Sequence, residues 1–191
     1  MGFCKSYTEF PLNGTFHYVG IRFLPTGFPT FFNVDAKQIS NREEKLAAVS
    51  KDTSEFVAHH FPGRYALPEI KLKLDQYFID LLNKSEVSVD KRFANALDII
   101  LQNNGEVNIT KDLDTGLSER QLRRYFDFYI GDSAKTFSRV VRFQKIFTEM
   151  SSNQALNGNK LFYDLGYYDQ PHFIKEFKKF YGLTPSKVLG R

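Results

Sequence analysis

Apolar residues recur every three to four positions in two separated stretches of the chain. The first stretch has Leu122, Tyr125, Phe126 and Tyr129, and the second has Phe173, Phe177 and Tyr181. This spacing is typical of an amphipathic helix with one inward face. Leu122 and Phe173 lie 51 residues apart, as do Phe126 and Phe177. The sequence therefore predicts two related helices.

Residues suited to helix ends flank the first turn of both predicted helices. Ser118 is a good N-cap, and Gln121 three residues later completes a capping box. Asp169 is the corresponding cap of the second helix. Pro171 follows in the first turn, where a missing N–H costs little.

Glycines bracket each predicted helix. Gly131 and Gly182 follow the helices and can end them in a left-handed turn. A short segment ending in Gly116 or Gly166 precedes each one. The simplest interpretation is a helix, a turn that contains glycine and a second helix, which is a helix-turn-helix motif present twice.

Other apolar patterns predict helices on both sides of a polar break at residues 85–90. The helix before the break is predicted by Leu74, Phe78, Leu81 and Leu82, and the helix after it by Phe93, Ala96, Leu97, Ile100 and Leu101. A later helix of about 16 residues, about 25 Å long, is predicted by Phe137, Val140, Val141, Gln144 and Phe147. We place a domain boundary at the break, which gives regions 1–85 and 86–191.

The first region differs in character from the second. Val19, Ile21 and Phe23 alternate with other residues, which predicts a strand. Phe28, Phe31 and Phe32 follow, and beside a single strand they are expected to be exposed. One strand cannot form a stable sheet, so we expect residues 1–85 to recruit a partner or to self-associate. The predicted fold is mainly α, with two helix-turn-helix motifs joined by a long helix and preceded by a small partial α+β region.

Three segments carry a family resemblance. GLSERQLRRYF, RVVRFQKIF and DLGYYDQPHFIKEFKKFYGLTPSKV resemble the DNA-binding domain of the AraC/XylS family of transcriptional regulators over about residues 90–189. GIRFLPTGFPTFFNV resembles the closing part of the N-terminal sensor region in a subgroup of that family, so residues 1–85 are expected to be a partial sensor or interaction region. The family usually has a small residue where the two helices of a motif cross. Phe162 stands there in the second motif, and Asp112 or Leu113 in the first, so we expect a looser or shifted crossing.

The resemblance implies that both motifs enter successive major-groove segments of double-stranded DNA and that RNA polymerase is a further partner. Helix-turn-helix proteins place the N-terminal residues of the second helix against base edges. The resemblance puts Arg120, Arg123 and Arg124 of the first motif, and Gln170, Pro171, Ile174 and Lys175 of the second, in the groove. The complete predicted DNA-binding set is Ser118, Arg120, Gln121, Arg123, Arg124, Gln170, Pro171, Ile174, Lys175, Lys178 and Lys179.

Each arginine and lysine has a specific expected role. A guanidinium group can pair with guanine O6 and N7, which suits Arg120, Arg123 and Arg124, although three arginines are also common on an ordinary solvated helix face. Lys178 and Lys179 are expected to contact phosphates, which adds affinity without sequence information. Arg139 and Arg142 on the long helix are expected to be structural.

The distribution of charge supports a polyanionic partner. The net charge of the 191 residues is only +4, but the part from Ser118 onward has 13 Lys and Arg against 7 Asp and Glu. A hydrophobic content of 42% and a charged content of 25% are those of an ordinary globular protein.

Candidate catalytic and metal-binding residues are few. The adjacent His59 and His60 point in different directions, and the four histidines show no metal-ligand spacing. Cys4 is the single cysteine, which fits a reducing cytoplasm. Some DNA-repair relatives with an AraC-type domain accept methyl groups and have a zinc site of several cysteines. A single cysteine argues strongly against that activity here. We expect no enzyme activity, no cofactor and a cytoplasmic location. The predicted function is a sequence-specific DNA-binding transcriptional regulator; the alternative is a truncated regulator that acts as a protein-interaction module with weak DNA binding.

Overall fold

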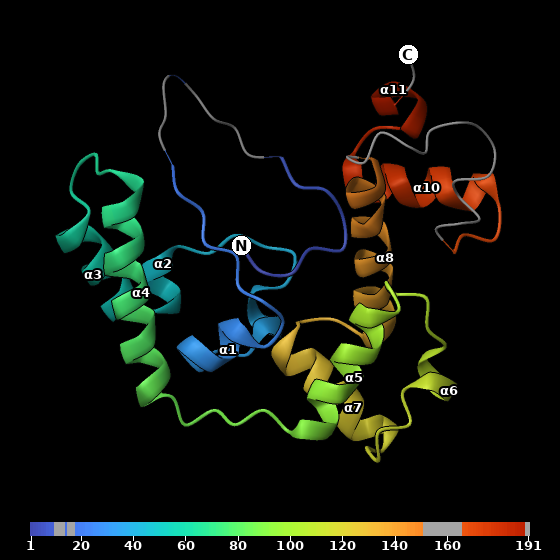
Figure 1. Ribbon diagram of the computed structural model, residues 1–191, viewed down its shortest axis with the longest axis horizontal. Helices are drawn as coiled ribbons and strands as arrows, with labels where there is room; N and C mark the ends of the chain where they lie inside the picture. The colour runs from blue at the N-terminus through green and yellow to red at the C-terminus, as the bar shows by residue number, and fades with distance from the viewer. Residues whose placement is uncertain (10–13, 15–17, 151–165, 190–191) are drawn as a thin grey trace.

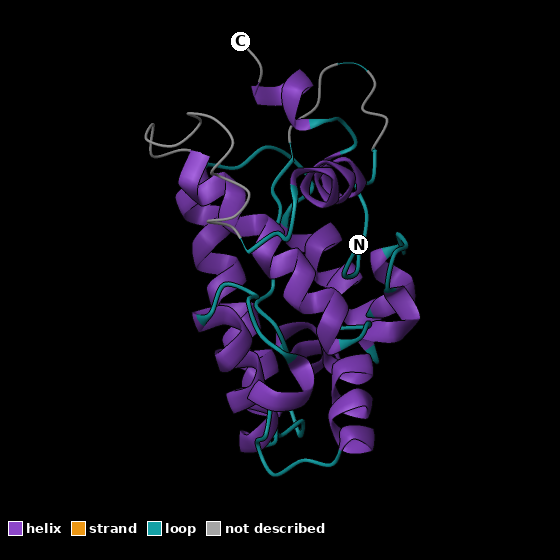
Figure 2. Cartoon of the chain, turned by 90° about the vertical axis from the view of Figure 1, so that its right-hand side faces the viewer, coloured by secondary structure: helices purple, strands orange, loops and turns teal. Residues whose placement is uncertain are grey.

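The computed structural model describes residues 1–9, 14, 18–150 and 166–189. Within these ranges the protein is helical and contains no strand (Figures 1 and 2). The α-helices are α1 (Gly27–Phe32), α2 (Leu46–Val49), α3 (Lys51–His60), α4 (Leu67–Lys84), α5 (Lys91–Gln102), α6 (Ile109–Asp112), α7 (Glu119–Tyr129), α8 (Ala134–Met150), α10 (Gln170–Tyr181) and α11 (Pro185–Leu189), and η1 (Ala36–Ile39) is a 3-10 helix. The mainly α prediction is confirmed.

The predicted strand at residues 19–24 is wrong. This segment has no regular secondary structure, and the partial α+β region is replaced by short helices and loops. An extended segment becomes a strand only when a neighbour satisfies its backbone N–H and C=O groups. Among the described residues no neighbouring segment pairs with it. The alternation of Val19, Ile21 and Phe23 therefore does not lead to a strand.

The aromatic residues of α1 pack against α4, which also corrects the sequence prediction. The rings of Phe23 and Phe31 lie 5.5 and 5.1 Å from that of Phe78, between centroids, so they share one cluster. Phe28, Phe31 and Phe32 are half-buried rather than exposed. The sequence pattern of α1 could not show this, because the partner ring lies on a distant helix.

The main hydrophobic core lies between α5, α7 and the start of α8 (Figure 1). Phe93, Ile100 and Phe126 are fully buried there. The remaining buried members are Ala96, Leu97, Leu113, Leu122, Tyr129, Ile130, Ala134 and Phe137. Leu101, predicted on the inward face, remains 41% exposed because it lies at the edge of the helix face formed by Phe93, Leu97 and Ile100.

Asp90 fixes the start of α5 against α7. Its side chain caps the helix by accepting from the Arg92 N–H, and it also accepts from the hydroxyl of Tyr125. Hydrogen bonds from Arg92 hold the pKa of the Asp90 carboxyl well below its usual range. The predicted polar break and cap at residues 85–90 are therefore confirmed.

The long helix α8 runs from the first motif to the second (Figure 1). Its 17 residues give a length of about 25 Å, as predicted. Arg142 donates from its guanidinium group to the carbonyl oxygens of Gly105 and Gly166, at 2.8 and 3.1 Å. Arg139 pairs with Glu176 of α10. The structural role predicted for both arginines is confirmed.

A second, smaller core lies between α8 and α10 and contains Phe143, Ile146, Tyr167, Phe173 and Phe177. Tyr181, predicted to face inward, is 40% exposed because it sits in the last turn, although its ring remains 5.4 Å from that of Phe177. The segment predicted to be the first helix of the second motif, including Phe162 at the predicted crossing, lies outside the described residues. In the first motif Leu113 at the crossing is buried.

Candidate nucleic-acid interface

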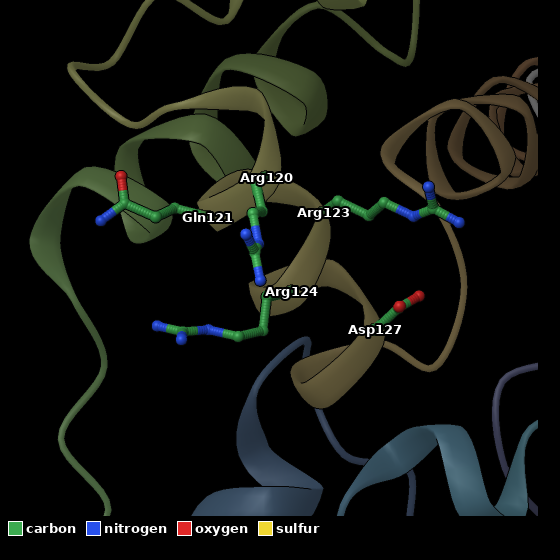
Figure 3. Close-up of a pocket in the computed structure, with 5 residues that line it drawn as sticks. All are labelled: Arg120, Gln121, Arg123, Arg124 and Asp127. Atoms are coloured by element: carbon green, nitrogen blue, oxygen red, sulfur yellow. The ribbon is translucent and has the colours of Figure 1, made fainter.

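The first turns of α7 present three arginines on its exposed face. Arg120, Arg123 and Arg124 are all exposed, and with Gln121 and Asp127 they line an open hollow on the surface (Figure 3). Among the described residues no ion pair engages any of the three guanidinium groups, although Arg124 lies 5.7 Å from the ring centroid of Tyr125. The side chains point outward from the helix in different directions (Figure 3). This face can therefore offer several donors to an anionic partner.

The predicted capping box holds the N-terminus of α7. The Ser118 hydroxyl accepts from the Gln121 N–H at 3.3 Å, and Gln121 Oε1 accepts from the Ser118 N–H at 3.0 Å. Ser118 and Gln121, both in the predicted DNA-binding set, are thus occupied in shaping the helix start. The N–H groups in the first turn of an α-helix and the helix dipole favour a negatively charged group at this end.

Asp127 has a partner that the sequence analysis did not find. It lies on the arginine-bearing side of α7, and its Oδ2 is 2.7 Å from Nζ of Lys37 in η1. A carboxylate facing a phosphate backbone would repel it, so pairing with Lys37 reduces that repulsion. No local signal could reveal this contact, because the two residues lie 90 positions apart.

The corresponding surface of α10 is less basic in its first turns. Gln170, Pro171, Ile174 and Lys175 are exposed, as is Lys178, whereas Lys179 is half-buried. Asp169 caps the helix by accepting from the His172 N–H at 2.7 Å, as predicted. The predicted outward residues of both motifs therefore lie on the outward faces of two capped helices.

A buried ion pair lies beneath α10. The Glu176 side chain is 1% exposed and pairs with Arg139 of α8, whose side chain is 35% exposed. Tyr167 packs in the same core, where burial and the nearby Glu176 carboxylate raise the pKa of its hydroxyl. The burial of Glu176 could have been predicted from the sequence, because Glu176 lies three positions after Phe173 and therefore on the same inward face of the helix.

Other types of site find little support in the described part of the chain. It contains no group of three or more His, Cys, Asp or Glu side chains placed to hold a metal ion. None of the helices seen there has the length and apolar character required to cross a membrane.

Comparison with known families gives two matches. Residues 114–191 match a helix-turn-helix domain. The match supports a DNA-binding transcription regulator of the AraC type. Residues 1–45 match a domain of unknown function (DUF6597). No curated protein and no solved structure matches the chain.

The helix-turn-helix match covers α7, α8, α10 and α11, so it contains every residue of the predicted DNA-binding set. It supports the resemblance found in the sequence for this part of the chain. The family of residues 1–45 has no assigned function, and these residues include Lys37, which pairs with the helix-turn-helix domain at Asp127.

Proposed function

We propose that this protein is a sequence-specific transcriptional regulator that inserts α7 and α10 into successive major-groove segments of double-stranded DNA. The observation that carries the proposal is the exposed arginine face at the capped N-terminus of α7, which no ion pair engages among the described residues, within a matched helix-turn-helix domain. An α-helix fits the major groove, and the N-terminal residues of the recognition helix meet the base edges there.

The two recognition helices have different proposed tasks. Arg120, Arg123 and Arg124 of α7 read bases, because a bidentate arginine discriminates guanine by about 1 to 3 kcal/mol. In α10, Gln170 and Lys175 can hydrogen-bond a base edge, whereas Ile174 can contact only an apolar group such as the thymine methyl. Lys178 and Lys179 bind phosphates, and residues 86–191 form the DNA-binding domain. RNA polymerase is the further partner that the AraC-type resemblance implies.

Salt-dependent binding tests the proposal. Phosphate contacts release counterions, so the logarithm of the binding constant should fall steeply and linearly with the logarithm of salt concentration. Lys178→Ala should weaken binding to all DNA sequences alike and lower the magnitude of this slope by about one. Lys84→Ala, which removes an exposed lysine at the end of α4, is the matched control and should leave the slope unchanged. DNA binding that does not depend on salt would contradict the proposal.

A protein-interaction module is the second candidate, and the exposed face of α4 favours it. Leu72, Ile79 and Leu82 are 73%, 52% and 51% exposed on this helix. Their spacings of seven and three residues place them on one face of the helix, which can pack against another helix. Self-association through residues 1–85 would show as a concentration-dependent sedimentation coefficient that Leu72→Glu abolishes. Such a result, combined with DNA binding no stronger than that of an unrelated basic protein, would favour this candidate.

A further inference from the structure

The N-terminal region contacts the two motifs at the same position of the repeat. Gly131 and Gly182 lie 51 residues apart, and each follows the end of a recognition helix with a left-handed φ, of 92° and 90°. A Cβ at Gly131 would lie 2.7 Å from the carbonyl oxygen of Ala36, and one at Gly182 would lie 3.0 Å from Cδ2 of Tyr7. Both glycines therefore allow a close approach of the N-terminal region to the end of a recognition helix.

The contact at α10 includes the backbone. The Tyr7 N–H donates to the carbonyl oxygen of Lys179 at 3.0 Å, and the Tyr7 ring covers Gly182. At the other motif, Lys37 pairs with Asp127, and Lys5 Nζ lies 4.0 Å from the carboxylate of Asp132. Each motif is thus held by a polar contact as well as by packing.

The two points of contact are joined to each other. The Asn41 N–H donates to the carbonyl oxygen of Phe3 at 2.9 Å, and the Lys5 N–H donates to Asn41 Oδ1 at 2.9 Å. The Phe3 ring also lies 6.2 Å from that of Phe137 at the start of α8. Residues 2–7 and 36–42, which we call the bridging segment, therefore form a continuous path from the end of α7 to the end of α10.

We propose that the bridging segment is a second connection between the two recognition helices, parallel to α8, that sets the separation of the DNA segments they read. Packing against the two ends of α8 positions the two recognition helices, but a long helix can still curve along its length, which leaves some freedom in their separation. A second tether removes this freedom, which preorganises both helices for one spacing. The reading of DNA spacing rests on the proposed function, whereas the tether itself does not. This assigns a role to part of residues 1–45, the domain whose function is unknown.

The tether can be tested without DNA by measuring the distance between spin labels on α7 and α10. Glu119→Cys and His172→Cys provide exposed sites on the two helices, in a Cys4→Ser background. Tyr7→Ala should broaden the distance distribution, because it removes the ring that covers Gly182. Tyr7→Phe keeps that ring and should retain the narrow distribution. Tyr65→Ala, which removes a tyrosine from the α3–α4 turn, should also retain it.

An unchanged distribution in Tyr7→Ala, with helix content equal to that of the unmutated protein, would overturn the tether. Broadening in Tyr65→Ala as well would also overturn it, because the effect would then not be specific to the bridging segment.

The consequence for DNA is tested with binding sites whose two half-sites are moved apart or together by one base pair. The unmutated protein should prefer one spacing, and Tyr7→Ala should reduce this preference by about fivefold, because the ring no longer packs on Gly182. An equal preference in both proteins would overturn the link to spacing. If no variant binds DNA at all, the proposed function fails, and the spin-label distances still decide whether the tether exists.

Discussion

The two helix-turn-helix motifs have equivalent inward residues and different outward ones. Phe126 and Phe177 are both fully buried, 51 residues apart, each in the core beneath its recognition helix. On the outward faces, three arginines of α7 contrast with the glutamine, proline and isoleucine of α10. Helix packing constrains the inward positions in both motifs, whereas it does not constrain the outward positions, which can therefore differ between α7 and α10.

The cores also differ. The core beneath α7 is large and apolar, whereas the smaller core beneath α10 contains the buried carboxylate of Glu176, paired with Arg139. A cavity in an apolar core lowers the free energy of unfolding, and so does removal of the partner of a buried charge. The first motif should therefore be most sensitive to truncation of its aromatic residues, and the second to loss of its ion pair.

The largest effect is expected from Phe126→Ala, which should lower the free energy of unfolding by about 4 kcal/mol, since truncation of a buried phenylalanine loses burial and leaves a cavity. Phe177→Ala removes the equivalent ring from the smaller core and should cost less. Urea unfolding followed by circular dichroism measures both values. A larger loss in the free energy of unfolding for Phe177→Ala than for Phe126→Ala would contradict the view that the core beneath α7 is the more sensitive to truncation.

Removal of one partner from the buried pair should have the next largest effect. Arg139→Met should lower the free energy of unfolding by about 3 kcal/mol, at the lower end of the range for buried pairs because Arg139 is partly exposed. The double variant Arg139→Met with Glu176→Leu should recover most of this loss, because no charge is then left buried without a partner. A double variant as unstable as Arg139→Met would show that the cost comes from lost packing and not from the unpaired carboxylate.

A smaller effect is expected at the start of α7. Ser118→Ala removes the N-cap hydrogen bond to Gln121 and should cost about 1 kcal/mol of stability. Ser118→Asp keeps an acceptor at the cap and should restore the unfolding midpoint. An unaltered midpoint in Ser118→Ala would mean that the capping box does not stabilise the helix in solution.

Features set by local sequence were predicted well. Ser118 and Gln121 lie three residues apart, and the inward stripe of α7 lies within a single helix, so neighbouring residues decide both. The outward positions of the predicted DNA-binding set follow from the same stripe. Phe173 and Lys175 therefore lie where the pattern of their own helix places them.

Features that depend on distant residues were missed or predicted wrongly. The alternation at residues 19–24 has the period of a strand, but a strand requires a partner that no local pattern can supply. The partial burial of Phe31 depends on Phe78, and the pairing of Asp127 depends on Lys37. The bridging segment is the extreme case, because its contacts join residues near position 5 to residues near position 180.

Selection of bound fragments from random DNA, carried out with four variants, tests most directly the claim that the first motif reads the bases. Arg120→Ala and Arg124→Ala should each relax the selected motif at particular base pairs, by about 1 to 3 kcal/mol. Ile174→Ala should change it little, and Arg64→Ala, an exposed arginine in the α3–α4 turn, should leave it unaltered. If both α7 variants select the unmodified motif and Ile174→Ala erases half of it, the assignment is reversed and α10 is the reader.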